Sequence, residues 1–367
     1  MRKSKWIRFL PFVPLILLLV GVNIFGDAGS QFHDIGDDAA VALLNGDAVY
    51  LSIYIDERDL KLGIVKNISD EVGCVALGAS IVKCVHSSDV GIDDFMNLGV
   101  SGGKFYDVMG LLGAMKFFNK HARKLIICFD PLYFLNSIYN SRNARRVSRK
   151  LLPYAEYFIE FLLNPDETND NPKPRLLLKF DTLPAMFSIS YFQQSVKQLP
   201  LLAPVMKSHE AQSNSKWGIM DGRAPDTTHF MPDGSQIYDK ATLAQTVEDV
   251  IKTAETYDIA ATSFEYEHAS EESKLVFEKL MRYCKAKGIK VKLFLCPLAP
   301  TLWDRYDHVK RPIFVELEEY AYELAEKYSL SITGSYNPHK IGVPDEAFYD
   351  ARHMRREKLS EYMDFTF

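Results

Sequence analysis

Short, mainly apolar runs alternate with helical patterns along most of this 367-residue chain. Such runs, bounded by glycine, proline or charged residues, are typical of strands that are buried on both faces of a parallel sheet. They predict strands at Val72–Leu77, Phe95–Leu98, Lys124–Phe129, Ala260–Glu265, Val291–Cys296 and Leu330–Thr333.

Apolar residues at helical spacing fill the intervals between these runs. The stretch from Phe105 to His121 predicts one helix. Another follows Ser270, a predicted N-cap ahead of two acidic residues, and a third pattern runs from Phe314 to Tyr328. Strands that alternate with helices predict an α/β domain whose parallel sheet carries helices on both faces, a three-layer, flavodoxin-like arrangement.

Two regions depart from this alternation. A long interruption, from about residue 141 to 257, is predicted to be an insertion in the domain. Residues 27–70 are predicted to form a stalk and entry segment with one strand candidate at Ala48–Ile55. The predicted organisation is a basic cytoplasmic tail at 1–8, a transmembrane signal anchor at 9–26, the stalk, and the α/β domain at 71–367.

The N-terminus determines the expected location. Four basic residues precede the run Phe9–Phe25, which contains no charge. Its length lies between that of a membrane span and that of a signal-peptide core. The following residues, Gly26–Gly29, match a signal-peptidase cleavage site poorly, so an uncleaved anchor is favoured over a cleaved signal. The positive flank stays in the cytoplasm, which predicts a single-pass protein of the cell membrane with an extracytoplasmic domain.

The composition argues against several classes of function. The net charge of −5 and the lack of a basic stripe argue against a nucleic-acid partner. The five cysteines fall in predicted strands and helices, where a thiol behaves as a small apolar group, so neither a disulfide framework nor a metal site is expected. No cofactor is implied.

A serine follows the first predicted strand of the domain. Ser80 is reached through the tight Gly78-Ala79 turn and opens a short helical stretch, Ile81–His86. In parallel sheets the ligand site lies beyond the carboxyl ends of the strands, so Ser80 is a candidate nucleophile. An ordinary N-cap serine is the alternative.

A glycine-rich segment follows the second predicted strand. Gly99, Gly102 and Gly103 allow the main chain to approach a ligand and to point amide hydrogens at it. The segment lacks the lysine and the spacing of a nucleotide loop. It is a candidate oxyanion pocket, with a flexible turn as the alternative.

The third fragment lies near the C-terminus. Asp350 and His353 are three residues apart, so the carboxylate can fold back onto the imidazole Nδ1 and leave Nε2 free as a general base. A surface helix capped by Asp350 is the alternative. The order of the three fragments predicts a Ser80–His353–Asp350 triad.

These fragments resemble the blocks of the SGNH (GDSL-like) hydrolase superfamily. Ser80 matches the first block, Gly102 the second, and Asp350 and His353 the last. The asparagine of the third block is missing, because Asp130-Pro131 follows the corresponding strand. The resemblance therefore implies an oxyanion pocket formed by the amides of Ser80 and Gly102.

The chain resembles the extracytoplasmic branch of that superfamily in its anchor, its insertion and its missing asparagine. That branch includes alginate O-acetylation factors and the D-alanyl transfer protein of teichoic acid synthesis. The resemblance implies a serine esterase or O-acetyltransferase that modifies a cell-envelope polysaccharide, with a multi-span membrane O-acyltransferase as partner. The alternative is a non-catalytic accessory or carbohydrate-binding protein with the same fold.

Three further residues are candidates for substrate binding. Asp130, at a strand end, is placed to bind a sugar hydroxyl or to cap the next segment. His229 and Asp233 belong to a stretch that either reaches over the site or simply forms a Pro-Asp-Gly turn.

Overall fold

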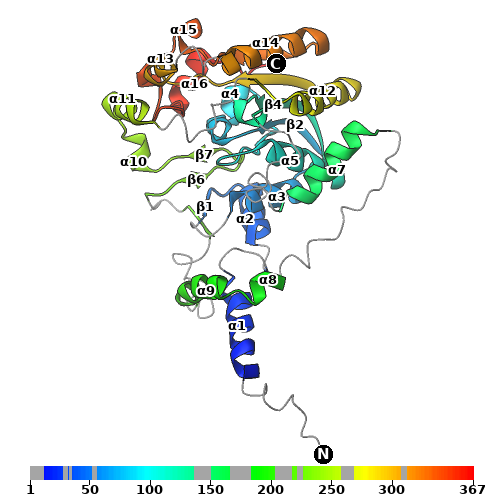
Figure 1. Ribbon diagram of the computed structural model, residues 1–367, viewed down its shortest axis with the longest axis vertical. Coiled ribbons are helices and arrows are strands. Elements are labelled where there is room, and N and C mark those ends of the chain that lie inside the picture. Colours follow the sequence, from blue (N-terminus) through cyan, green and yellow to red (C-terminus); the bar gives the residue numbers. More distant parts are fainter. Residues whose placement is uncertain are drawn as a thin grey trace, which may run out of the picture.

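A five-stranded parallel sheet forms the centre of the protein (Figure 1). The computed structural model describes residues 12–27, 32, 35–51, 56–135, 150–165, 183–202, 217–220, 226–257, 268–306 and 312–367. The sheet order is β3-β2-β4-β8-β9, and the strands are β2 (Glu71–Leu77), β3 (Phe95–Asn97), β4 (His121–Cys128), β8 (Lys290–Leu295) and β9 (Ser331–Gly334). When these five strands are numbered by their place along the chain, the order across the sheet is 2-1-3-4-5. This is the order of a flavodoxin-like doubly wound sheet. The predicted α/β fold with a parallel sheet is confirmed; the predicted strand Ala260–Glu265 lies outside the described residues.

Apolar side chains are buried on both faces of this sheet. Val75 and Leu77 belong to one core cluster, whereas Cys74 and Ala76 belong to another on the opposite face. The first cluster includes residues of α3 (Glu57–Asn67), α5 (Phe105–Phe117), α7 (Leu152–Leu163), α12 (Glu271–Ala286) and α14 (Pro312–Tyr328). The second includes residues of η2 (Ser80–Cys84), α4 (Ser87–Val90), α11 (Val247–Thr256) and α16 (Arg356–Tyr362). Burial on both faces explains why the strands are almost continuously apolar.

Local predictions agree with the structure in most details. Ser270 caps α12, where its hydroxyl accepts a hydrogen bond from the amide of Ser273. All five cysteines are free and buried. The helix predicted to reach His121 ends at Phe117, because β4 begins at His121 and pairs there with β2. The remaining short elements are η3 (Pro131–Tyr133), α10 (Lys240–Leu243), α13 (Pro300–Arg305), α15 (Pro338–Ile341) and η6 (Asp345–Ala347).

The segment predicted as a stalk is largely part of the domain. Within residues 27–70, α2 (Ile35–Leu44) and α3 pack against each other so closely that a Cβ on Gly36 would overlap the backbone of Asp59. Leu60 and Ile64 of α3 are fully buried in the core. The sequence analysis did not expect this segment in the core, because α3 also buries charged residues, among them Arg58 and Asp59, which make the segment look solvent-exposed in the sequence.

The insertion adds strands to a second, antiparallel sheet. Its order is β5-β1-β6-β7, where β1 (Val49–Leu51) comes from the predicted stalk and β5 (Trp217–Ile219), β6 (His229–Phe230) and β7 (Gln236–Ile237) come from the insertion. The turn between β6 and β7 rests on the central sheet, since Asn97 donates its amide to Asp233 O at 2.7 Å. Lys61 of α3 joins the same parts by donating to Asn97 O at 2.9 Å and Gly234 O at 2.5 Å. Complete burial lowers the pKa of Lys61 to about 7.

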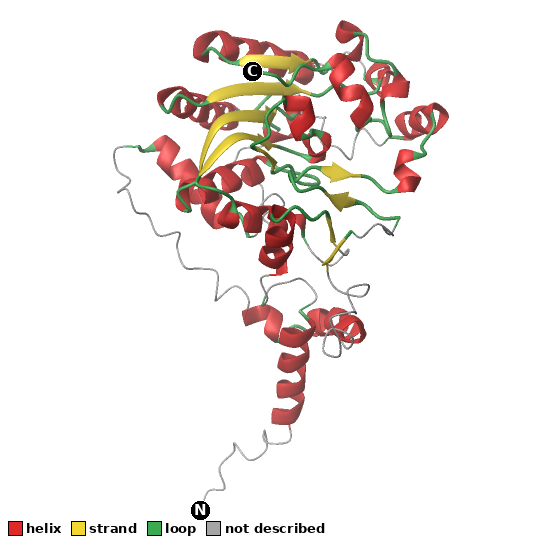
Figure 2. Ribbon diagram, turned by 180° about the vertical axis from the view of Figure 1, so that it is seen from behind, coloured by secondary structure: helices red, strands yellow, loops and turns green. Residues whose placement is uncertain are grey.

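The N-terminal helix α1 (Val13–Gly26) contacts two helices of the insertion, α8 (Leu183–Met186) and α9 (Ile189–Leu202), as both views show (Figures 1 and 2). Within the described part of the chain, no helix combines the length and apolar character needed to cross a bilayer. The predicted basic tail and the first residues of the predicted 9–26 anchor lie outside the described residues.

Gly234 should be required at the turn between β6 and β7. It has φ +76°, and a Cβ there would overlap Asn97 O, so we expect Gly234→Ala to lower the free energy of unfolding by about 3 kcal/mol or more. Gly288 is the matched control, because it has a similar φ of +69° with open space around the Cβ position. Gly288→Ala should cost only about 1 kcal/mol in urea unfolding. Equal losses in both variants would contradict the close packing of the turn on β3.

Candidate active site

Ser80 lies at the carboxyl end of β2, beside the end of β4. The turn after β2 places Gly78 at φ +151°, where a Cβ would overlap the Cβ of Cys128. Glycine is therefore needed for the chain to turn against β4. Ala79, not Ser80, occupies the N-cap of η2, and the Ser80 Oγ lies 2.7 Å from Nε2 of His353. The hydroxyl thus interacts with a residue 273 positions away instead of capping the local helix.

Asp350 lies on the other side of the His353 imidazole. Nδ1 of His353 is 2.8 Å and 3.0 Å from the two carboxylate oxygens. The Asp350 carboxylate also accepts the amides of Arg352 and His353, each at 2.8 Å, which holds it in one orientation. The segment is a loop, since α16 begins only at Arg356 with Arg355 as its N-cap, and this geometry disfavours the capped-helix alternative.

These contacts determine the charge of the Asp350 carboxylate. Burial by itself would raise its pKa, but the hydrogen bond and charge of His353, together with the two amides, lower it to about 2. The carboxylate therefore stays ionised, which keeps the proton on Nδ1 and leaves Nε2 to accept the serine proton. The structure thus brings together all three residues of the predicted triad.

The glycine-rich segment after β3 packs directly on the Gly78-Ala79 turn. Val100 donates its amide to Gly78 O at 3.0 Å, and a Cβ on Gly103 would lie 2.8 Å from the same oxygen. Gly102 has φ +57° with open space where a Cβ would stand. The loop that carries Gly102 therefore adjoins the turn that carries Ser80, as an oxyanion pocket formed by their amides requires.

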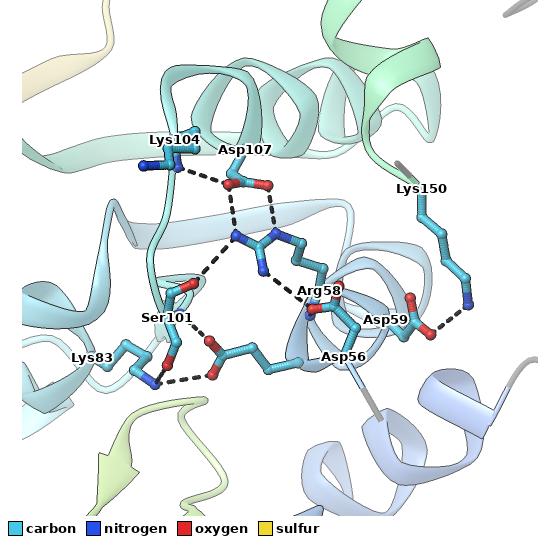
Figure 3. Close-up of polar contacts among 9 residues, drawn as sticks. Asp56, Arg58, Asp59, Lys83, Ser101, Lys104, Asp107 and Lys150 are labelled. Atoms are coloured by element: carbon cyan, nitrogen blue, oxygen red, sulfur yellow. Dashed lines mark hydrogen bonds and ion pairs between the residues drawn. The ribbon is translucent and has the colours of Figure 1, made fainter. Parts of the chain in front are cut away.

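Residues that the sequence analysis did not select hold this loop in place (Figure 3). Glu57, at the start of α3, accepts the amide of Ser101 and also pairs with Lys83 at 3.0 Å. Arg58 donates to Ser101 O at 3.2 Å and makes a two-point ion pair with Asp107, with distances of 2.8 and 3.0 Å. The local signal was the run of charges at the start of α3, which resembles an ordinary exposed helix end.

Asp130 lies just beyond the carboxyl end of β4. One carboxylate oxygen caps η3 by accepting the amide of Leu132 at 2.9 Å, and the other faces Arg352 at 3.7 Å. Asp130 is buried, and Arg352 belongs to the same loop as His353. The capping alternative for Asp130 therefore holds, and its ion pair ties the Asp350–His353 loop to β4.

The structure does not bring His229 and Asp233 to the triad. The Asp233 carboxylate accepts the amides of Ser87 and Ser235, each at 2.9 Å, and so fixes the turn against α4. Nδ1 of His229 lies 3.1 Å from Thr227 O in the second sheet. No contact described in the structure joins either residue to Ser80, so the Pro-Asp-Gly turn accounts for this stretch.

A different residue of the insertion lies beside the triad. The ring of Tyr238, just after β7, is 6.4 Å from the His353 ring in an edge-to-face arrangement and 5.4 Å from that of Tyr349. Burial raises the pKa of the Tyr238 phenol, so it stays protonated. The insertion therefore reaches the site through an aromatic ring that no pattern in the sequence marked.

No protein-family model matches this chain, and a search of curated proteins finds no significantly similar sequence. Among the described residues, no cluster of three or more His, Cys, Asp or Glu side chains is arranged to hold a metal ion.

The low pKa of Asp350 predicts a specific pH dependence of stability. A carboxylate whose folded-state pKa is depressed stabilises the fold above its unfolded pKa of ~3.9, and this contribution is lost as the pH falls through about 2. We expect the difference in unfolding free energy between wild type and Asp350→Asn to be fully present at about pH 5 and to shrink below about 4. The measurement is denaturant unfolding of both proteins across this pH range, and the control is Asp93→Asn at an exposed aspartate. A difference that stays constant down to the lowest pH would contradict the assignment.

Proposed function

We propose that this protein is a serine acyl-transfer enzyme, an esterase or O-acetyltransferase with an SGNH-like domain. The observation that carries the proposal is the continuous hydrogen-bond chain from Ser80 Oγ through the His353 imidazole to Asp350. Its position beyond the strand ends, at the point between β2 and β4 where the strand order reverses, supports the same interpretation.

The proposed reaction has two steps. Nε2 of His353 takes the proton of Ser80 as Oγ attacks an ester carbonyl, and the amides of Ser80 and Gly102 stabilise the oxyanion. His353 then gives that proton to the departing alkoxide, which leaves an acyl group on Ser80. In the second step His353 deprotonates water or a sugar hydroxyl, which attacks the acyl-serine, and the proton returns to Ser80. Asp350 stabilises each imidazolium that forms.

The proposed location is the outer face of the cell membrane, with the run Phe9–Phe25 as the anchor. The described part of this run, α1, keeps the apolar character of an anchor. A cell-surface or secreted polysaccharide is then the acceptor within reach, and a multi-span membrane O-acyltransferase is a suitable donor partner.

One observation favours a second candidate, an accessory or carbohydrate-binding protein that lacks activity. The carboxylate of Asp130 caps η3 and faces Arg352, so the side chain at this strand end supplies no third hydrogen-bond donor to an oxyanion. The protein would be an enzyme if the amides of Ser80 and Gly102 alone stabilise the oxyanion well enough for turnover. It would be an accessory protein if they do not.

Chemical labelling of Ser80 tests the enzyme proposal. A fluorophosphonate should label the wild-type protein, and a small activated acetyl ester should be hydrolysed slowly. Ser80→Ala should abolish both, and His353→Ala should reduce hydrolysis by about 10³-fold or more, because triad members act as a unit. Asp350→Asn should reduce hydrolysis nearly as much, since the tautomer of His353 is no longer fixed. Folded wild-type protein that neither labels nor turns over would favour the accessory function.

The support of the glycine loop generates a second prediction. Arg58→Lys removes the two-point geometry toward Asp107 and Ser101, and should lower kcat about 10- to 100-fold with little change in KM, because a displaced oxyanion donor weakens only the transition state. The matched control is Lys150→Ala, which breaks the ion pair with Asp59 on another side of α3, as Figure 3 shows. Equal losses of kcat in Arg58→Lys and Lys150→Ala would mean that the ion pairs of α3 affect activity only by stabilising the fold.

A further inference from the structure

Helix α1 is apolar around its whole circumference. Leu15, Leu17 and Leu18 lie on different sides of the helix, yet their exposed fractions are 62, 65 and 57%. Phe25, near its C-terminal end, is 70% exposed. A helix with apolar side chains exposed on every side suits hydrocarbon rather than water.

The C-terminal end of α1 is locked to helices α8 and α9 of the insertion. Asn23 is fully buried, and its Nδ2 donates to the carbonyls of Ala185, Met186 and Ser188 at 2.9, 2.9 and 3.1 Å. These carbonyls lie at the end of α8, where a helix leaves acceptors unsatisfied. Asparagine is the one strongly polar side chain within α1, so its position specifies this junction.

Two further contacts fix α9 across the end of α1. A Cβ on Gly26 would lie 2.6 Å from the Cβ of Ser195, so the two helices meet almost backbone to backbone. The Tyr191 hydroxyl donates to the Asp27 carboxylate at 2.7 Å. Figures 1 and 2 both show α9 running across α1 instead of alongside it. An α1 that enters a membrane would therefore hold α9 roughly parallel to the membrane surface.

Helix α9 has one apolar and one polar flank. At 100° per residue, Ile189 and Val196 share a flank next to the face through which Ser195 meets α1. Their exposed fractions are 69 and 41%, so this flank is uncovered by the described chain. Ser190 and Gln194, both exposed, lie on the other side. The apolar surface of α1 therefore continues onto one side of α9 only.

We propose that α8 and α9 form a membrane-surface element, with Ile189 and Val196 inserted among lipids and Ser190 and Gln194 in water. A lipid surface is the occupant favoured by the structure, because the exposed apolar side chains surround α1 completely and continue on a single flank of α9, as a helix at a membrane–water interface requires. The inference rests on the membrane anchor in the proposed function. It assigns the insertion a role in holding the domain close to the membrane, where membrane-bound acyl donors lie.

Accessibility of single cysteines tests this inference on full-length protein in vesicles of phosphatidylcholine and phosphatidylglycerol. The native cysteines are buried, so nitroxide labels can be placed on Ile189→Cys and Val196→Cys, with Ser190→Cys and Gln194→Cys as matched controls on the same helix. We expect positions 189 and 196 to collide severalfold more with oxygen than with a water-soluble nickel complex, and positions 190 and 194 to show the reverse. Nickel accessibility at all four positions would overturn the inference. Protection of 189 and 196 from both reagents would also overturn it and would indicate contact with a second copy of the chain.

Two further measurements separate this inference from the proposals on which it rests. A label at Leu17→Cys reports on α1 alone, so nickel accessibility there would refute the anchor and the inference together. Lipid exposure at position 17 with water exposure at 189 would refute the inference only. Fluorophosphonate labelling of Ser80 in the same vesicles tests the catalytic proposal separately.

Discussion

The contact between Gly78 and Cys128 determines the geometry of the candidate active site. Because a glycine stands where any side chain would overlap β4, the chain after β2 turns tightly and presents Ser80 at the strand end. The glycine-rich loop rests on the carbonyl of Gly78. Two residues beyond Cys128, Asp130 faces Arg352 and so ties the loop of His353 to the same edge. The Ser80 turn, the glycine-rich loop and the loop of His353 are thus all positioned against two neighbouring strand ends.

Buried charges connect the rest of the chain to this edge. Arg58 and Asp107 form an ion pair with almost no solvent exposure, and Lys61 is wholly buried between carbonyl oxygens of the central sheet and of the insertion. Removing charges from water is costly, and such pairs often add little net stability. Their value here is geometric, because a buried cation that loses its partners is strongly unfavourable. They therefore favour one arrangement of α3, the glycine loop and the insertion turn.

The sequence predicted the parts of the protein whose signals are local. Strands buried on both faces stand out as apolar runs, and the glycine turn before Ser80 and the Asp350–His353 spacing carry short-range geometry. Helix α3 was missed because its buried charges are satisfied by residues far along the chain, such as Asp107. The strands of the second sheet are two or three residues long, too short to show a period. Tyr238 was missed because only the tertiary fold brings it to His353.

The insertion links the proposed chemistry to its surroundings. Its strands position Tyr238 beside the imidazole, and its helices α8 and α9 are locked to α1. An acyl-serine partitions between hydrolysis and transfer according to whether water or a sugar hydroxyl occupies the space next to the base. Tyr238 lies next to the imidazole, so under the proposed mechanism a side chain of the insertion that contacts α1 would limit water there. A polysaccharide acceptor would then be selected by the insertion, whereas the strand ends of the sheet supply only the chemistry common to both reactions.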